Sequence, residues 1–531
     1  MIEKATRSAV LWVLSITLAA LFSAFQIQSA LHSGSLSVPV SYDDVGYFND
    51  ALARLEVLYL DGGKAFLKQF WTNPPHAPLQ TLLALLGFGV FGPAPWAADA
   101  MNALPLAIVL RLFLEFACRS LPLPVAALAG TAFLGYPLLG LFVLEFRPDM
   151  MCALLTSIGA LIVVADPRWR EGRRVTLGTT VALFVGALLA KPTLAPVTVA
   201  VFGAAFFAAV TLHSNSRTEA KKIVRIAFVC GALGVLIVLP YYVAILPHLI
   251  DYISVNALGI NAHLWRANLS WSNHALYYLT GAGGLIAIGR AWLVLGCTIM
   301  ILTLPLAIRF HRTTLAIFLV ALMAYAGVTV PAMKSPFLGV IVSAFLLCII
   351  AILVVQILKR LPRQFLLVAA LGLLTFSALT WRPVALILNT FGRPATGMQA
   401  EQYTRIYSQT ADALASISDL GRRQLYFPVI AQYLNPDNIE FELRRRNFPV
   451  PTMPRVYHDG DISAHRDLIS KSDLAVLFSN ETTLPNPWPA STGVRNEIGS
   501  ALAATNSFEL FATVDGGPFG GQVLIFKRKG T

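Results

Sequence analysis

The chain has 531 residues, of which 56% are hydrophobic and only 13% are charged, and its mean hydropathy is +0.66. Charged residues make up about a quarter of an average soluble protein, so this composition excludes an ordinary soluble protein and indicates a polytopic membrane protein. The net charge of +12 does not indicate nucleic-acid binding here, because basic loops that hold helices against an anionic leaflet account for the same excess.

The first apolar segment covers residues 9–31, follows Lys4 and Arg7, and lacks the small-residue cleavage site of a signal peptide, which predicts a retained signal anchor. Later apolar stretches of about 17 to 24 residues are long enough to cross a bilayer. They cover residues 99–118, 123–145, 149–165, 175–190, 193–212, 223–246, 286–308, 313–331, 336–357 and 364–381. We predict an α-helical membrane domain over residues 1–392 with about 11 to 13 transmembrane helices.

The basic residues orient these helices. If the N-terminus is cytoplasmic, every basic cluster between helices falls on the cytoplasmic side. The clusters are Arg119, residues 168–174, 217–225, 309–312 and 359–363. This holds only if the short, glycine-interrupted stretch Pro78–Phe91 does not cross, so we expect an interfacial or re-entrant helix there and leave a span open. The first outer loop, residues 32–98, and everything after Trp381 then lie outside the cytoplasm.

The first outer loop carries two adjacent acids, Asp43 and Asp44, with Tyr47 three residues on. The apolar spacing from Tyr47 to Phe70 predicts a helix lying on the membrane surface. A carboxylate at that boundary is partly desolvated, which raises its pKa and suits a general base. The alternative is that the acids cap the helix that follows, where Asp is favoured.

A proline-rich segment, Asn73-Pro74-Pro75-His76-Ala77-Pro78, ends the same loop. His76 is a candidate to bind a sugar hydroxyl or a metal ion, although a lone histidine beside prolines is more often a structural hydrogen-bonding residue. No group of residues has the spacing of a metal site, so we predict no resident metal and leave the use of a divalent cation open.

Four further charges fall on the outer side at helix ends: Arg147 and Asp149 around Pro148, then Lys191 and Lys334. Either ion of Arg147-Pro148-Asp149 alone would be costly there, so we expect the two to pair with each other or with a ligand. Lysines at helix ends often only extend into the interface. Together with the arginine, however, they indicate an anion site, with phosphate as the obvious ligand.

From about residue 393 the apolar runs shorten and polar residues and prolines return. Short β-like runs at 424–429, 474–478, 508–514 and 522–526 alternate with helical patterns at 400–420 and 464–472. We predict a C-terminal extracytoplasmic α/β domain over residues 393–531. Asp515-Gly516-Gly517 and Gly520-Gly521 are expected to form tight turns.

Taken together, residues 1–380 resemble the polytopic glycosyltransferases of the C-type (GT-C) superfamily that use polyprenyl-phosphate sugars. These include protein O-mannosyltransferases and the lipid A aminoarabinose transferases. The resemblance rests on the order and common side of several motifs: Asp43-Asp44 with Tyr47, the segment from Asn73 to Pro78, Phe91-Gly92, Arg147-Pro148-Asp149 and Lys191-Pro192. The chain has His76 in its proline motif, whereas a Glu-Lys pair precedes the prolines of the lipid A enzymes, so the acceptor cannot be carried over.

The resemblance implies an inverting, single-displacement transfer of a hexose or pentose from a polyprenyl-phosphate donor to an acceptor hydroxyl or amine. It implies that an acid of the first outer loop deprotonates the acceptor, with Asp43 preferred over Asp44, and that Asp149 is a second outer acid. Basic residues would hold the lipid phosphate, which assigns substrate-binding roles to Arg147, Lys191 and Lys334. Tyr47 and His76 are the remaining substrate-binding candidates.

The expected partners are the polyprenyl-phosphate sugar, membrane lipid and a glycan, lipid or protein acceptor of the cell envelope, with no nucleic acid. The expected location is the bacterial inner (plasma) membrane. A transporter or flippase of a lipid-linked or anionic substrate is the competing class. Transporters place ionisable residues near the membrane midplane and are often built from inverted repeats, whereas here the charges gather at one face and no repeat is evident. An inactive GT-C-like structural protein is the third possibility.

Overall fold

The computed structural model describes residues 2–37, 43–254, 266–280, 282–307, 311–331, 333–381, 397–431, 434–457, 459–479, 490–517 and 520–530. Contacts divide the chain into two compact units. We call residues 1–26, 67–83 and 100–384 the helical unit, and residues 27–66, 84–99 and 385–531 the mixed unit.

The helices before residue 120 are α1 (Ile2–His32), α2 (Asp43–Leu60), α3 (Gly62–Thr72), α4 (Pro78–Phe91), α5 (Pro95–Ala100) and α6 (Ala103–Ala117). The next are α7 (Leu123–Leu134), α8 (Pro137–Leu144), α9 (Pro148–Ala165), α10 (Pro167–Glu171), α11 (Arg174–Ala190), the 3-10 turn η1 (Pro192–Leu194), α12 (Ala195–His213) and α13 (Arg217–Ile253). The series continues with α15 (Trp271–Thr280), α16 (Ala282–Ile288), α17 (Arg290–Ala307), α18 (His311–Thr329), α19 (Val340–Leu358) and α20 (Arg363–Thr380).

The prediction of a polytopic helical membrane protein is confirmed. Among the described residues, eight helices are long and apolar enough to cross a membrane, and α7 and α8 add a ninth span if this bent pair counts as one. Shorter apolar helices occupy 78–91, 174–190 and 290–302. The predicted span 123–145 is therefore not straight: the chain bends by 67° where Pro137 begins α8.

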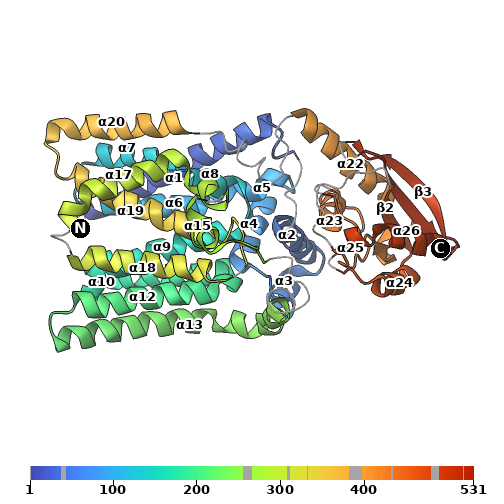
Figure 1. The fold of residues 1–531 in the computed structure, drawn as a ribbon, viewed down its shortest axis with the longest axis horizontal. Helices are drawn as coiled ribbons and strands as arrows, with labels where there is room; N and C mark the ends of the chain where they lie inside the picture. The colour runs from blue at the N-terminus through green and yellow to red at the C-terminus, as the bar shows by residue number, and fades with distance from the viewer. Residues whose placement is uncertain are drawn as a thin grey trace. The chain divides into compact units, whose positions relative to one another are not determined.

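Within the helical unit, α9 is the central helix. It packs against α11, α12 and α19, while α12 packs against α18, α11 against α13, and α20 against α7 (Figure 1). Nearly every side chain of α9 is buried, which is why its sequence is apolar all round rather than on one face. The two ends of α9 are thus fixed by neighbours on several sides.

The expected surface helix over Tyr47–Phe70 is two helices in the structure. α2 ends at Leu60 and α3 begins at Gly62, whose φ of +82° lies in the left-handed region that ends helices. The short helix predicted at Pro78–Phe91 is present with those bounds as α4.

The C-terminal part of the mixed unit contains the predicted α/β fold. Its strands are β1 (Leu425–Tyr426), β2 (Leu474–Phe478), β3 (Phe508–Asp515) and β4 (Gln522–Arg528), and its helices are α22 (Gly397–Ala415), η5 (Leu420–Arg422), α23 (Pro436–Arg445), α24 (Ile462–Lys471), α25 (Ala490–Gly493) and α26 (Arg495–Ala504). The sheet order is β1-β2-β4-β3, with β1 and β2 parallel and the other pairs antiparallel. Gly517, Gly520 and Gly521, all at positive φ, turn the chain between β3 and β4 as expected.

Alternate residues of β2 build two apolar layers on this sheet. Leu474, Val476 and Phe478 pack with α22 and α23, whereas Ala475 packs with α24 and α26. The domain is therefore a three-layer sandwich in which both faces of the sheet carry helices (Figure 1).

Candidate functional site

A buried ion pair between Asp149 and Lys191 forms the centre of the candidate site. The Lys191 Nζ lies 3.3 Å from Asp149 Oδ2, and the two side chains are only 12% and 4% exposed. Burying either charge without a partner would cost free energy, so each ion stabilises the other. The two residues are far apart in the sequence, and the fold brings them together.

Two prolines explain why these charges sit at helix ends. Pro148 starts α9, where its missing N–H has no helical partner to lose, and this puts Asp149 in the first turn, where a carboxylate is favoured by the helix dipole. Pro192 cannot continue α11, so that helix ends at Ala190 and Lys191 takes a non-helical conformation before η1.

Arg147, which the sequence predicted to pair with Asp149 or with a ligand, contacts Glu145 and Phe337 in the structure. Its Nε lies 4.0 Å from the buried carboxylate of Glu145, and its guanidinium lies 3.7 Å from the centre of the Phe337 ring. Arg147 precedes α9 in an extended conformation, whereas Asp149 is already helical, so the two side chains leave the backbone differently. The arginine is held by a carboxylate and an aromatic face.

Lys334 lies between α18 and α19 and caps α18. Its Nζ donates hydrogen bonds to the carbonyls of Thr329 and Pro331, at 2.6 and 2.7 Å, and lies 5.5 Å from the Tyr278 ring centre. Burial lowers the pKa of this lysine. These contacts fit the alternative, left open by the sequence, that Lys334 has a structural role, because two of the three N–H donors of its ammonium group bond to carbonyl oxygens.

His76 lies in the helical unit, two residues before the start of α4. Its side chain is exposed and its ring lies against Tyr252 of α13, with ring centroids 5.6 Å apart and the planes tilted by 49°. The Tyr241 hydroxyl donates to the carbonyl of Pro75 at 2.8 Å. These contacts tie the proline motif to α13.

Asp43 and Asp44 are the first two residues of α2. The structure does not describe their side chains, so the role of a general base and the role of a helix cap both stay predictions. Tyr47, one turn on, is buried.

The C-terminal domain holds α2 in place through α23. Asn49 donates to the backbone carbonyl of Asp437 at 2.8 Å, and Glu56 pairs with Arg444 at 2.8 Å. The Phe48 ring lies against Phe441, with centroids 5.6 Å apart. The helix that begins with the candidate base is thus fixed by residues from the other end of the chain.

Sequence reasoning did not find Glu145, Phe337 or α23. An acid two residues before Arg147 was a usable sequence signal for Glu145, and Asn435-Pro436 was one for the start of α23, whereas no local pattern pointed to Phe337. Within the part of the chain whose side chains are described, no three His, Cys, Asp or Glu residues cluster closely enough to hold a metal ion.

The sequence matches no protein-family model and no curated protein. The fold, however, is similar to two crystal structures of ArnT, a lipid A aminoarabinose transferase of the GT-C superfamily, from Cupriavidus metallidurans. The structure bound to undecaprenyl phosphate aligns with a TM-score of 0.60 and 15% identity over 96% of this chain and 98% of that one. The apo structure aligns with the same TM-score and identity over 98% of both chains. The chain therefore shares its overall fold with these ArnT structures.

Proposed function

We propose that this protein is a membrane glycosyltransferase that moves a sugar from a polyprenyl-phosphate donor to an acceptor hydroxyl or amine on the outer face of the membrane. The observation that carries the proposal is the buried Asp149–Lys191 pair at two helix ends of a GT-C fold. A similar structure of nearly the same length binds undecaprenyl phosphate, which supports a lipid phosphate as the ligand.

The lysine and the arginine would bind the phosphate that leaves. When the bond between the anomeric carbon and the phosphate oxygen breaks, its electron pair stays on that oxygen, and fixed cations stabilise the developing charge. An ammonium group has three donors, so Lys191 can keep Asp149 and contact a phosphate oxygen at once. Asp149 would then position Lys191, and Arg147 would supply the second charge. Lys334 is the weaker candidate because it caps α18.

Asp43 would act as the base, with Asp44 as the alternative. It takes the proton of the acceptor hydroxyl while the acceptor oxygen bonds to the anomeric carbon from the side opposite the phosphate. A single displacement of this kind inverts the configuration at that carbon. The acceptor class and the sugar are open within this proposal.

The test uses the purified full-length protein and a panel of radiolabelled polyprenyl-phosphate sugars. We expect at least one donor to lose its label to an acceptor from the cell envelope. Replacing both acids, Asp43→Asn with Asp44→Asn, should reduce transfer at least a hundredfold, as expected for loss of a general base. Asp61→Asn, an exposed acid just after α2, is the matched control and should retain wild-type transfer.

Unchanged sugar transfer by the double variant would rule out Asp43 and Asp44 as the general base. A product that retains the anomeric configuration, as determined by NMR, would rule out a single-displacement mechanism. Binding of the lipid phosphate without transfer from any donor would support an inactive or transporting protein instead.

A further inference from the structure

The helical unit contains an apolar cavity near the opposite ends of α9 and α11 from the Asp149–Lys191 pair. Its volume is about 180 Å³, and its walls come mainly from α6, α9, α11 and α19, with single residues of α7, α8 and α10. Representative lining residues are Leu110, Phe113, Leu154, Leu161, Leu347 and Ile352. An apolar cavity of about 150 Å³ stays dry and binds small hydrocarbons, so a cavity of this size is suited to part of a hydrocarbon chain.

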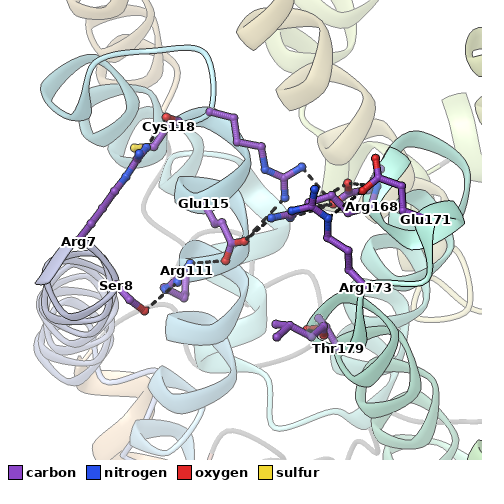
Figure 2. Close-up of polar contacts among 12 residues, drawn as sticks. Arg7, Ser8, Arg111, Glu115, Cys118, Arg168, Glu171, Arg173 and Thr179 are labelled. Atoms are coloured by element: carbon purple, nitrogen blue, oxygen red, sulfur yellow. Dashed lines mark hydrogen bonds and ion pairs between the residues drawn. The ribbon is translucent and has the colours of Figure 1, made fainter. Parts of the chain in front are cut away.

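One end of the cavity is polar, and ion pairs build it. Arg119 and Arg168 both reach Asp166, at 3.0 and 2.9 Å, and Arg168 also reaches Glu115 at 3.1 Å. Arg111 pairs with the same Glu115 at 2.8 Å. Figure 2 shows Glu115 receiving Arg111 from its own helix and Arg168 from the α10 side. Since Glu115, Arg119, Asp166 and Arg168 also line the cavity, its polar rim is a connected network.

The four charged residues that line the cavity balance, with Arg119 and Arg168 against Glu115 and Asp166, but the chain beside them adds a positive excess. The segment from Asp166 to Arg174 has four arginines against two acids, and Arg119 and Arg173 remain 34% and 63% exposed. An arginine in such a network has donors left for a phosphate. The charge excess favours an anionic ligand over a neutral or zwitterionic one.

The cavity also reaches the outer surface of the helices. Val175, at the start of α11, lines the cavity and is 83% exposed, and Thr179 one turn later is partly exposed. A lipid tail could therefore enter from the side of α11.

We propose that this cavity and its rim bind an anionic glycerophospholipid, with an acyl chain in the cavity and the headgroup phosphate on Arg119 and Arg168. By the orientation expected from the basic loops, the lipid belongs to the cytoplasmic leaflet. The site is distinct from the proposed donor site: Asp149 lies in the first turn of α9, Asp166 follows its last residue, and the 18 residues of this helix are about 27 Å long.

The test measures thermal unfolding of the full-length protein in detergent with added dioleoyl-phosphatidylglycerol or dioleoyl-phosphatidylcholine. We expect phosphatidylglycerol to raise the unfolding temperature and phosphatidylcholine to raise it less. Thr179→Trp, which fills the mouth of the cavity, should abolish the difference. Thr211→Trp is the matched control, because both threonine hydroxyls bond to the carbonyl four residues earlier at 2.9 Å. It should respond like the wild type.

A second arm tests the headgroup. Arg119→Gln should shift the half-maximal phosphatidylglycerol concentration upward about tenfold, as expected for loss of a charged hydrogen bond. Arg363→Gln, an exposed arginine at the start of α20, should leave it unchanged. Phosphatidylglycerol with a photoreactive acyl terminus should label α6, α9, α11 or α19 of the unaltered protein, and this measurement needs no variant to fold.

Equal stabilisation by the two lipids would overturn the anionic headgroup. A wild-type response from Thr179→Trp, or labelling confined to other helices, would overturn the cavity as the site. Displacement of phosphatidylglycerol from this site by polyprenyl phosphate would replace the phospholipid with the donor carrier. None of these measurements depends on sugar transfer, so the lipid-binding proposal and the proposed enzyme activity are tested separately.

Discussion

Asp149 and Lys191 are two buried charges in a membrane protein, and each compensates the charge of the other. The Lys191 Nζ lies 3.3 Å from Asp149 Oδ2, and neither side chain is exposed enough for water to replace its partner. Removing one partner of such a pair leaves a buried charge, which is usually worse than removing both.

We therefore predict strong coupling between these residues. Asp149→Leu and Lys191→Leu should each lower the free energy of unfolding by about 3–5 kcal/mol, and the double variant should lose less than the sum. The measurement is chemical unfolding in mixed micelles. Additive losses would show that the pair is not energetically coupled. Arg173→Leu, whose pair with Glu171 is largely exposed, is the control and should cost less than about 1 kcal/mol.

The N-cap of helix α24 contains a carboxylate whose protonation affects the helix. Asp461 begins α24 by accepting hydrogen bonds from Ser463, and the bond from the Ser463 hydroxyl, followed by that from its N–H, lowers the pKa of this exposed carboxyl. A carboxylate with a lowered pKa contributes stability that is present above its unfolded pKa, about 3.9. That contribution is lost as the pH falls through the lower, folded value.

This cap predicts a pH dependence of local stability. The helix α24 should lose protection against amide hydrogen exchange as the pH is lowered below about 4. Asp461→Asn keeps a capping side chain but cannot titrate, so its exchange should show a weaker dependence on pH in that window. The same slope in both proteins would exclude Asp461 as the titrating group. Asp467→Asn, which removes another exposed acid of α24, serves as the control.

Sequence patterns predicted elements better than partners. The helix at Pro78–Phe91 and the strand at Leu474–Phe478 were predicted with their observed bounds, because apolar runs and flanking prolines or glycines mark their ends. The helix α23 was missed because its apolar positions are few, although Asn435 and Pro436 give a usual start signal. The stacking of Arg147 on Phe337 depends on the tertiary fold, which no local pattern encodes.

At the scale of the whole molecule, the mixed unit is assembled from separate stretches of chain. It combines residues 27–66 and 84–99 with the C-terminal segment. Phe441 of α23 lies against both Phe48 of α2 and Phe88 of α4. The domain after residue 397 is therefore part of the structure that carries Asp43, and it is more than an appended module.

We predict that this aromatic contact affects transfer as well as stability. Phe441→Ala should cost about 3–5 kcal/mol of stability and also lower kcat, because α2 loses its support. Phe427→Ala removes a ring buried elsewhere in the same domain, with Phe478 as its neighbour, so it should cost similar stability at unchanged kcat. Activity is compared at a temperature where both variants are folded. An equal effect of both variants on kcat would contradict the support of α2 through α23.

The bond from Asn49 to Asp437 also has a consequence for biosynthesis. The two residues are 388 positions apart, and a ribosome adds about 5–20 residues per second, so α2 emerges roughly 20–80 s before α23 exists. During that interval the face of α2 that carries Val45, Phe48 and Ala51, all buried in the folded protein, lacks its partner helix α23. Nascent chains halted before residue 436 should therefore expose α2 to protease, whereas released full-length chains should protect it.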